Sequence, residues 1–504
     1  MSDRDVDVIV IGSGIGGLTT AALLSRYGKR VTVCESHTIA GGAAHSFSRQ
    51  GFHFDSGPSF YCGLNDSHSR NPLRQVLNVL EETLPAIPYD PLGHYHFPEG
   101  TLPVYSQQKR YLEAVSQFTP QGSKELERFI QRLLPLYDTL QGIPTILLRA
   151  DWQLIPVLMG RCLPSLVKIL PHLGLVQSSV GQVMDREVGD RWVRRLIDLE
   201  CFLLSGLKAH GTIAPEVAFM LGERSRAGVE YPIGGSGAIV EALVRGLKRW
   251  GGELRLGCHV EQILVESNKV TGVRLRKGEI LTAPIVISNA SIWDTYGKLL
   301  KPEDLPASYR QTALATPAVD SFMHLHLGIK AEGLDNLTGH HVVVHDAESD
   351  ITTPGNTCMI SIPSVWDDSL APPGHHVVHA YTLESHEHWQ RDNSYQERKK
   401  ERSQSLYRAL ERVIPDIRQR IVLELIGTPL THAHYLRRYQ GTYGAAIAAN
   451  QGMFPSTHTP ISGLYRVGDS TTPGIGVPAV AASGILCANT LVQPQQTAEL
   501  LNIQ

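Results

Sequence analysis

Three glycines near the N-terminus, Gly12, Gly14 and Gly17, have the spacing G-x-G-x-x-G and follow a run of β-branched apolar residues at 6–11. Such a run is typical of a strand buried on both faces of a parallel sheet. Here the first glycine permits a tight turn, the second lets the backbone approach a diphosphate, and the third lets the next helix pack closely on the strand. The spacing predicts a dinucleotide site, with a plain strand–helix–strand unit as the alternative.

An acidic residue, Glu35, ends the second predicted strand at 30–35. A carboxylate in this place accepts hydrogen bonds from the adenosine ribose and disfavours a 2′-phosphate, so NADP is not expected. The helix predicted before it, at 16–27, would direct its free N–H groups at the diphosphate. Gly41 and Gly42 follow Glu35 and give a second close backbone approach just beyond the ribose.

A similar turn lies near the C-terminus, where a short strand at 463–467 ends in Gly468 and Asp469. Gly476 and Val477 then open a helix of small residues. The N–H groups at such a helix start suit the electron-rich edge of a flavin ring, and Asp469 would accept hydrogen bonds from a ribityl chain. The alternative is a last strand and helix that only close the sheet.

Composition excludes several classes of protein. With 504 residues, 42% of them hydrophobic and 19% charged, the chain is an ordinary globular protein long enough for two or more domains. A net charge of −3 gives no reason to expect a nucleic-acid partner. The seven cysteines are scattered without a C-x-x-C pair, so neither a zinc site nor a disulfide framework is expected.

The order of these motifs predicts an α/β fold with a discontinuous nucleotide-binding domain of the Rossmann type. Its parallel sheet, helices and a β-meander would come from residues 1–70, 230–300 and 455–504. An inserted α+β domain, facing substrate and membrane, would come from residues 71–229 and 301–454, and the first of these insertions is expected to be mostly helical.

Blocks along most of the chain resemble one branch of a known family. They are residues 11–18, 230–235, 287–300, 361–364, 368–372, 427–432, 441–444 and 468–470. Together they are similar to the carotenoid cis–trans isomerase (prolycopene isomerase) branch of the phytoene-desaturase-type flavoproteins. The resemblance implies an amine-oxidase/phytoene-desaturase-like fold and FAD bound non-covalently. It also implies that the backbone of a residue placed like Val260 contacts the adenine.

The activity implied by the resemblance is cis-to-trans isomerisation of poly-cis carotenes, prolycopene to all-trans-lycopene, with reduced FAD and no net redox change. Residues 55–59 and 473–478 look closer to desaturases and ketolases, so desaturation, saturation, hydration and ketolation stay open, with a quinone or another electron partner. A non-enzymatic prenyl-binding protein of the GDP-dissociation-inhibitor type is a further alternative. The intact glycines argue against it, because the nucleotide site of those proteins is degraded.

Several polar residues in the family-like blocks are candidates for catalysis, with a structural role as the alternative for each. They are Glu230, Tyr231, His432, Arg437 and Tyr443. In every one of these reactions the flavin would carry the difficult chemistry and the protein would position the polyene in an apolar tunnel.

Three H-x-H pairs, at 94–96, 324–326 and 432–434, are a pattern that could bind a metal ion. Alternation along a strand puts both members of such a pair on one face. No convergent carboxylate or cysteine pattern accompanies them, so no metal site is expected.

The most apolar stretch, residues 152–180, is broken by Pro156, Pro164 and Pro171. It cannot form one helix of about 20 apolar residues, and we expect it either to dock on a membrane surface and form the tunnel mouth or to lie in the core. Residues 1–5 lead into the first strand without a signal or transit pattern. We therefore expect a peripheral protein on the cytoplasmic face of a bacterial or cyanobacterial membrane.

Overall fold

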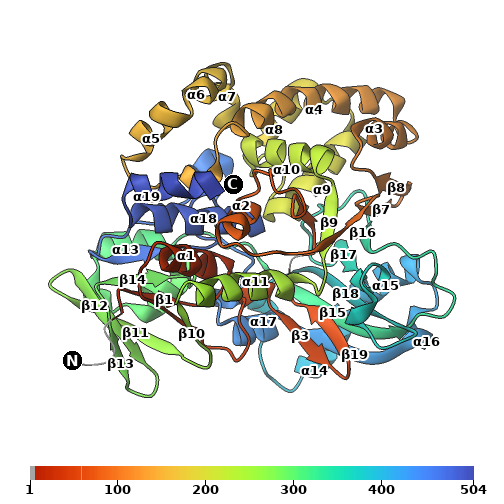
Figure 1. Cartoon of the computed structure of the whole chain (residues 1–504). Coiled ribbons are helices and arrows are strands. Elements are labelled where there is room, and N and C mark those ends of the chain that lie inside the picture. Colours follow the sequence, from red (N-terminus) through yellow and green to blue (C-terminus); the bar gives the residue numbers. More distant parts are fainter. Residues whose placement is uncertain (1–5, 58, 504) are drawn as a thin grey trace.

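The computed structural model describes residues 6–57 and 59–503, and its centre is a five-stranded parallel sheet (Figure 1). The strands follow the order β10 (Glu253–Arg255), β2 (Val31–Cys34), β1 (Val8–Ile11), β14 (Ile285–Ser288) and β20 (Leu464–Arg466). Alternate residues of β1 enter two different cores, with Val8 and Val10 in one and Ile9 and Ile11 in the other. The strand is therefore buried on both faces, as its β-branched run predicts. One prediction, the absence of a targeting segment at residues 1–5, falls on residues outside those described.

Helices cover one face of this sheet and a small antiparallel sheet covers the other. The helices are α1 (Ile15–Arg26), α11 (Ser236–Arg249) and α18 (Val477–Thr490), and α1 packs against both of the others. The small sheet consists of β11 (Val260–Glu266), β12 (Lys269–Leu275) and β13 (Ile280–Thr282). The strands of this parallel sheet come from parts of the sequence that lie far apart, so the sheet is complete only when these parts pack together.

A second, seven-stranded sheet lies beside the first domain. Its order is β19 (Ile421–Gly427), β15 (Ser321–Lys330), β18 (His375–Glu384), β17 (Thr357–Ser361), β16 (His340–Val344), β7 (Gly93–Phe97) and β8 (Gly100–Val104). All neighbours are antiparallel except β16 and β7, which are parallel. Helix α15 (Gln404–Val413) packs on β17 and β18, and α14 (Tyr395–Arg402) and α16 (Ile417–Arg420) flank it.

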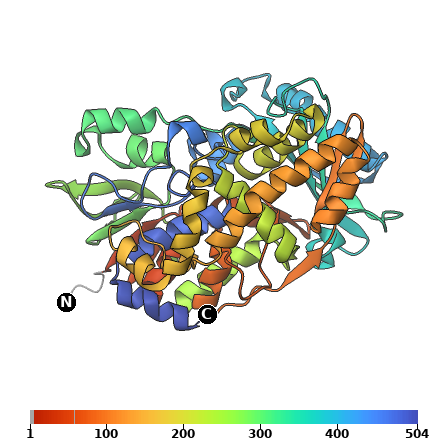
Figure 2. The ribbon, with the colours of Figure 1, turned by 90° about the horizontal axis from the view of Figure 1, so that it is seen from above.

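A helical layer covers the second sheet, and Figure 2 shows its long helices crossing the molecule. The helices are α3 (Gln108–Ser116), α4 (Pro120–Leu140), α8 (Val180–Glu187), α9 (Arg191–Ser205) and α10 (Ala214–Arg226), whereas α2 (Pro72–Val79) packs on α18 of the first domain. Helix α4 begins at Pro120 because the Thr119 hydroxyl accepts a hydrogen bond from the Gly122 N–H, at 3.1 Å. Its buried stripe packs on α10.

The first insertion is mostly helical, as predicted, but it also contains strands that were not predicted. Besides the helices it contains β6 (Ala86–Tyr89), β7 and β8, and β7 and β8 join the second sheet. Tyr95 and Phe97 of β7 point to the core while His94 and His96 are half-buried, the alternation of a strand with one covered face. Further short strands and helices lie elsewhere in the chain: β3 (Ser46–Arg49), β4 (Phe52–Asp55), β5 (Tyr61–Cys62), β9 (Val229–Pro232), α12 (Ile292–Asp294), α13 (Ala307–Leu314), α17 (Pro429–Leu436) and α19 (Pro494–Glu499).

The apolar stretch forms short helices on the surface, at the upper edge of Figure 1. They are α5 (Leu154–Arg161), α6 (Leu163–Ile169) and α7 (Leu173–Val176). Neither α5 nor α6 has a buried residue, and Trp152 before them is 76% exposed, so the interpretation as core is wrong for these two helices, although Leu175 and Val180 at the end of the stretch are buried. Among the residues described, no single helix is long and apolar enough to span a membrane. Leu154–Arg161 and Leu163–Val176 meet the length and composition test only together, across a bend of 100°.

Candidate functional site

A cavity of about 790 Å³ lies at the carboxyl ends of the parallel strands. Its lining includes the residues that follow four of them: Gly12 after β1, Glu35 after β2, Asn289 after β14 and Gly468 near the end of β20. Ligands of open α/β sheets bind in the crevice outside these strand ends. The topology therefore brings the predicted N-terminal and C-terminal motifs to one place.

The two predicted glycine turns lie against each other at this cavity. A Cβ on Gly42 would stand 3.1 Å from the Cα of Gly14, and the Gly41 N–H donates to the Ser13 carbonyl at 3.1 Å. A Cβ on Gly17 would lie only 2.3 Å from the Gly12 carbonyl oxygen. Gly17 is not in the cavity lining and allows α1 to pack on β1, as the spacing predicts, whereas Gly12, Gly14, Gly41 and Gly42 line the cavity.

The carboxylate of Glu35 is fixed in the cavity wall. One of its oxygens accepts hydrogen bonds from the Ser13 N–H at 2.8 Å and the Ser13 hydroxyl at 2.6 Å. The other accepts one from the His37 N–H at 2.7 Å. These bonds hold the acidic group beside the glycine turn, where a ribose next to a diphosphate would reach it.

Two helix N-termini open onto the cavity without a capping side chain. Gly14 is the N-cap of α1 and Gly476 the N-cap of α18, and neither helix has a side-chain cap. A Cβ on Gly476 would meet no atom within 4 Å. Because free N–H groups and the helix dipole favour negative charge, this arrangement fits the diphosphate and ring edge of a dinucleotide. Val477, at the start of α18, and Val260, at the start of β11, also line the cavity.

Asp469, predicted to bind a ribityl chain, forms an ion pair with a cationic side chain. Its carboxylate is 2.6 Å from a guanidinium nitrogen of Arg438, and both residues line the cavity. No pattern in the sequence singled out Arg438. Asn289 was not predicted as a site residue either, although it lies in the family-like block at 287–300. Its side chain lies against Gly14, where a Cβ would come within 2.5 Å of its amide nitrogen.

Aromatic side chains form the opposite wall of the cavity. The ring of Phe322 lies 5.2 Å from that of Tyr443 and 5.6 Å from that of Tyr381, as measured between centroids. Burial raises the pKa of Tyr381 to about 12 and that of Tyr443 well above its ordinary value, so both phenols stay neutral. The cavity therefore has a nucleotide-like end and an apolar, aromatic end.

Comparison with known proteins identifies the chemistry of the nucleotide-like end. A model of the flavin containing amine oxidoreductases matches residues 15–492. The chain belongs to this family. As a flavin containing amine oxidoreductase it has a flavin as its cofactor, and the uncapped helix ends and close glycine turns fit such a group.

Relatives of this flavoprotein include enzymes named for carotenoids. It is 35% identical to a chloroplastic prolycopene isomerase of an Oncidium hybrid, over 96% of this chain and 84% of the relative. It is 27% identical to a neurosporene-forming phytoene desaturase of Cereibacter sphaeroides, over 97% and 94%. An oxidoreductase structure from Methanosarcina mazei has a TM-score of 0.63 at 21% identity, covering 95% of this chain and 99% of that one, which shows a shared fold. The predicted family resemblance and fold class are confirmed.

The five candidate catalytic residues of this flavoprotein divide into two groups. His432, Arg437 and Tyr443 line the cavity, whereas Glu230 and Tyr231 do not. Glu230 accepts hydrogen bonds from the Leu64 N–H at 2.6 Å and the Asn65 N–H at 3.1 Å. The Tyr231 hydroxyl donates to Asp55 at 2.7 Å. In this structure both residues tie β9 to neighbouring segments.

The tautomer of His432 follows from one hydrogen bond. Its Nδ1 lies 2.9 Å from the Gly441 carbonyl oxygen, which can only accept, so Nδ1 carries the proton when the ring is neutral. Burial lowers the pKa of His432 to about 4, which keeps the ring neutral near pH 7. The unprotonated Nε2 is then available as a base in the cavity wall.

Proposed function

We propose that this flavoprotein is a FAD-dependent carotenoid isomerase that converts poly-cis carotenes to the all-trans form, prolycopene to all-trans-lycopene, with reduced FAD and no net redox change. The observation that carries the proposal is the large cavity, which joins a nucleotide-like end to an aromatic wall. Similarity to prolycopene isomerases over nearly the whole chain supports the reaction type. Carotenoid desaturation is the second candidate, because phytoene desaturases are also similar over nearly the whole chain.

In this proposal the residues at the strand ends hold FAD non-covalently. They are Gly12, Gly14, Gly17, Glu35, Gly41, Gly42, Val260, Gly468, Asp469, Gly476 and Val477. When bound there, reduced FAD would supply the electron density that lowers the bond order of a conjugated double bond. Phe322, Tyr381 and Tyr443 hold the polyene and exclude water, while His432 Nε2 can hold a proton at the cavity wall. Arg438 fixes the Asp469 carboxylate.

The reaction is tested by an anaerobic assay of the holoprotein on a poly-cis carotene with chemically reduced FAD. Products are resolved by mass and by chromatographic retention. Isomerisation predicts an unchanged mass and a changed retention. Loss of two hydrogens with a quinone as the acceptor would instead establish desaturation, and a gain of hydrogen or oxygen would establish saturation, hydration or ketolation. Stoichiometric flavin in the purified protein argues against the prenyl-binding alternative.

We also propose that α5, α6 and α7 dock this flavoprotein on a membrane surface, from which a water-insoluble carotene is taken up. Ile155 is 68% exposed and Leu170 60% exposed, and Arg161 and Lys168 are positioned among such residues. Short amphipathic pieces with cations suit the interface with anionic lipids. No residue of 152–180 lines the cavity, so this segment does not form the cavity mouth in the structure described.

The domain boundaries belong to the same proposal. Residues 1–70, 230–300 and 455–504 would form the FAD-binding domain, and residues 71–229 and 301–454 the domain that faces substrate and membrane. The sheet of β10, β2, β1, β14 and β20 draws its strands from the first set, and the seven-stranded sheet draws its strands from the second.

A further inference from the structure

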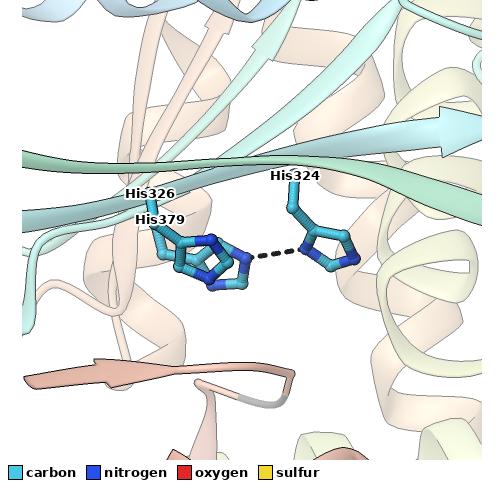
Figure 3. A group of neighbouring side chains, drawn as sticks. All are labelled: His324, His326 and His379. Atoms are coloured by element: carbon cyan, nitrogen blue, oxygen red, sulfur yellow. Dashed lines mark hydrogen bonds between the residues drawn. The ribbon is translucent and has the colours of Figure 1, made fainter. Parts of the chain in front are cut away.

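Two histidines of the second sheet form a hydrogen-bonded pair beside the cavity (Figure 3). His324 of β15 and His379 of β18 lie on neighbouring strands, with His324 Nδ1 2.9 Å from His379 Nε2. Their other nitrogens, His324 Nε2 and His379 Nδ1, are buried and have no hydrogen-bond partner among the residues described. Since buried polar atoms are nearly always paired, two free nitrogens at opposite ends of one pair need an explanation.

Each histidine of the pair lines a different cavity. His324 lines the large cavity, together with His432, whose ring centroid is 5.1 Å away. His379 lines a second cavity of about 10 Å³, close to the volume that one water molecule requires. The exposed residue His53 also lines this small cavity. The pair thus joins the lining of the large cavity to that of a small cavity which an exposed residue also lines.

Counting protons shows what such a pair can do. Burial lowers the pKa of both histidines well below the ordinary value, so the two rings are neutral and together carry two N–H groups. One proton lies in the bond between the rings. The other is on one of the two outer nitrogens, either His324 Nε2 or His379 Nδ1. The pair therefore has two tautomeric arrangements, one with a donor and the other with an acceptor at His324 Nε2.

We propose that His324 and His379 are a proton relay between water near the surface and the polyene. This proposal rests on the carotenoid function above. A proton from water binds His379 Nδ1, the bridging proton moves to His324 Nδ1, and the proton on His324 Nε2 passes to a carbon of the conjugated chain. One proton enters, one leaves, and no electrons move. Isomerisation returns the proton by the same path once the bond has rotated, which resets both tautomers.

A metal site is the other use that this cluster suggests, because one nitrogen from each of His324, His326 and His379 lies within 4.8 Å of the others. The ring planes disfavour it. His326 and His379 stack almost parallel, at 6° with 4.3 Å between centroids, so their in-plane lone pairs do not converge on one point. His326 Nε2 instead donates to the Asp55 carbonyl at 3.2 Å.

Matched variants test the relay by activity. His379→Gln can still donate to His324 but cannot pass a proton through, so we expect kcat to fall about 100-fold, the range of general acid–base catalysis. KM for the carotene should be unchanged, because His379 does not line the large cavity. His326→Gln is the control, as buried and on the same sheet face, and should retain kcat. In His379→Ala, added imidazole should restore part of kcat, which a purely structural role would not allow. Equal losses in both glutamine variants, or no rescue, would overturn the relay.

A measurement on the wild-type holoprotein needs neither activity nor a variant that folds. In protein labelled with ¹⁵N-histidine, the shared proton should give a ¹⁵N–¹⁵N coupling across the bond between His324 and His379. The pair His96 and His341, joined at 3.1 Å, is an internal reference for such a coupling. Absence of the first coupling with the second present would overturn the relay, as would one equivalent of bound zinc. If the coupling is present but no carotene reacts, the proposed carotenoid function is wrong, while the hydrogen-bonded histidine pair is confirmed.

Discussion

At the scale of single residues, two tyrosines with raised pKa values have different surroundings. The Tyr231 hydroxyl donates a hydrogen bond to the Asp55 carboxylate, which also accepts one from the Ser236 N–H at 2.9 Å. Tyr443, in contrast, lines the cavity. We expect Tyr231→Phe to lower the free energy of unfolding by about 1 kcal/mol and leave kcat unchanged. Tyr443→Ala should raise KM for the carotene about tenfold, since an aromatic contact of roughly 1.4 kcal/mol corresponds to that factor. Urea unfolding and steady-state assays measure both. Lost activity with intact stability in Tyr231→Phe would put this residue in the chemistry.

Site residues were predictable from the sequence where the elements that position them follow one another directly along the chain. Gly12, Gly14 and Glu35 were found because the strand, turn and helix that place them are continuous in sequence. His324 and His379 were not, because they meet only through the register of β15 and β18, in which His326 lies opposite His379. Sequence spacing put His324 and His326 on one face and could not supply the third ring.

At the scale of elements, α5 and α6 present an apolar surface that the rest of the chain does not cover. Replacing Ile155, Val167 and Leu170 with serine should abolish flotation with anionic liposomes while changing stability little, because all three side chains are more than half exposed. Ile280→Ser, at a residue 56% exposed on β13, is the matched control and should float like the wild type. Flotation of the triple variant at the wild-type level would contradict docking.

Elements of the first insertion were predicted unevenly for a physical reason. Helix α4 carries a long apolar stripe and an N-cap, both of them local signals. Strands β7 and β8 are only five residues each, and β8 contains Pro103, so periodicity is weak. What stabilises β7 is its pairing with β16, far along the chain, and a single sequence does not display that pairing.

At the scale of the whole molecule, the cofactor cavity is closed by segments from both ends of the chain, so binding and folding are linked. A ligand that binds only the folded state at 100 times its dissociation constant adds about 2.7 kcal/mol to the free energy of unfolding. Protein stripped of flavin by mild acid or high salt should unfold at a lower temperature, and added FAD should restore the melting temperature. NADP is the control and should not. Equal melting temperatures with and without FAD would contradict the assigned site.

Acid sensitivity is a second property of the whole molecule, because many histidines are buried uncharged. Burial lowers the pKa of His340 and of His341 to about 3, against about 6.5 in an unfolded chain. Above pH 6.5 both histidines are neutral in the folded and in the unfolded chain, so they do not make the free energy of unfolding depend on pH. As the pH falls from 6.5 toward 3, the unfolded chain binds protons that the folded chain excludes, so each group lowers the free energy of unfolding by about 1.4 kcal/mol per pH unit. The free energy of unfolding of His340→Gln can be measured with urea at pH 7, 6 and 5, in steps of about one pH unit. Its fall with decreasing pH should be smaller than that of the wild type by about 1.4 kcal/mol per pH unit. His388→Gln, at an exposed site, should keep the wild-type slope. Equal slopes in all three proteins would mean that His340 takes up its proton as readily folded as unfolded.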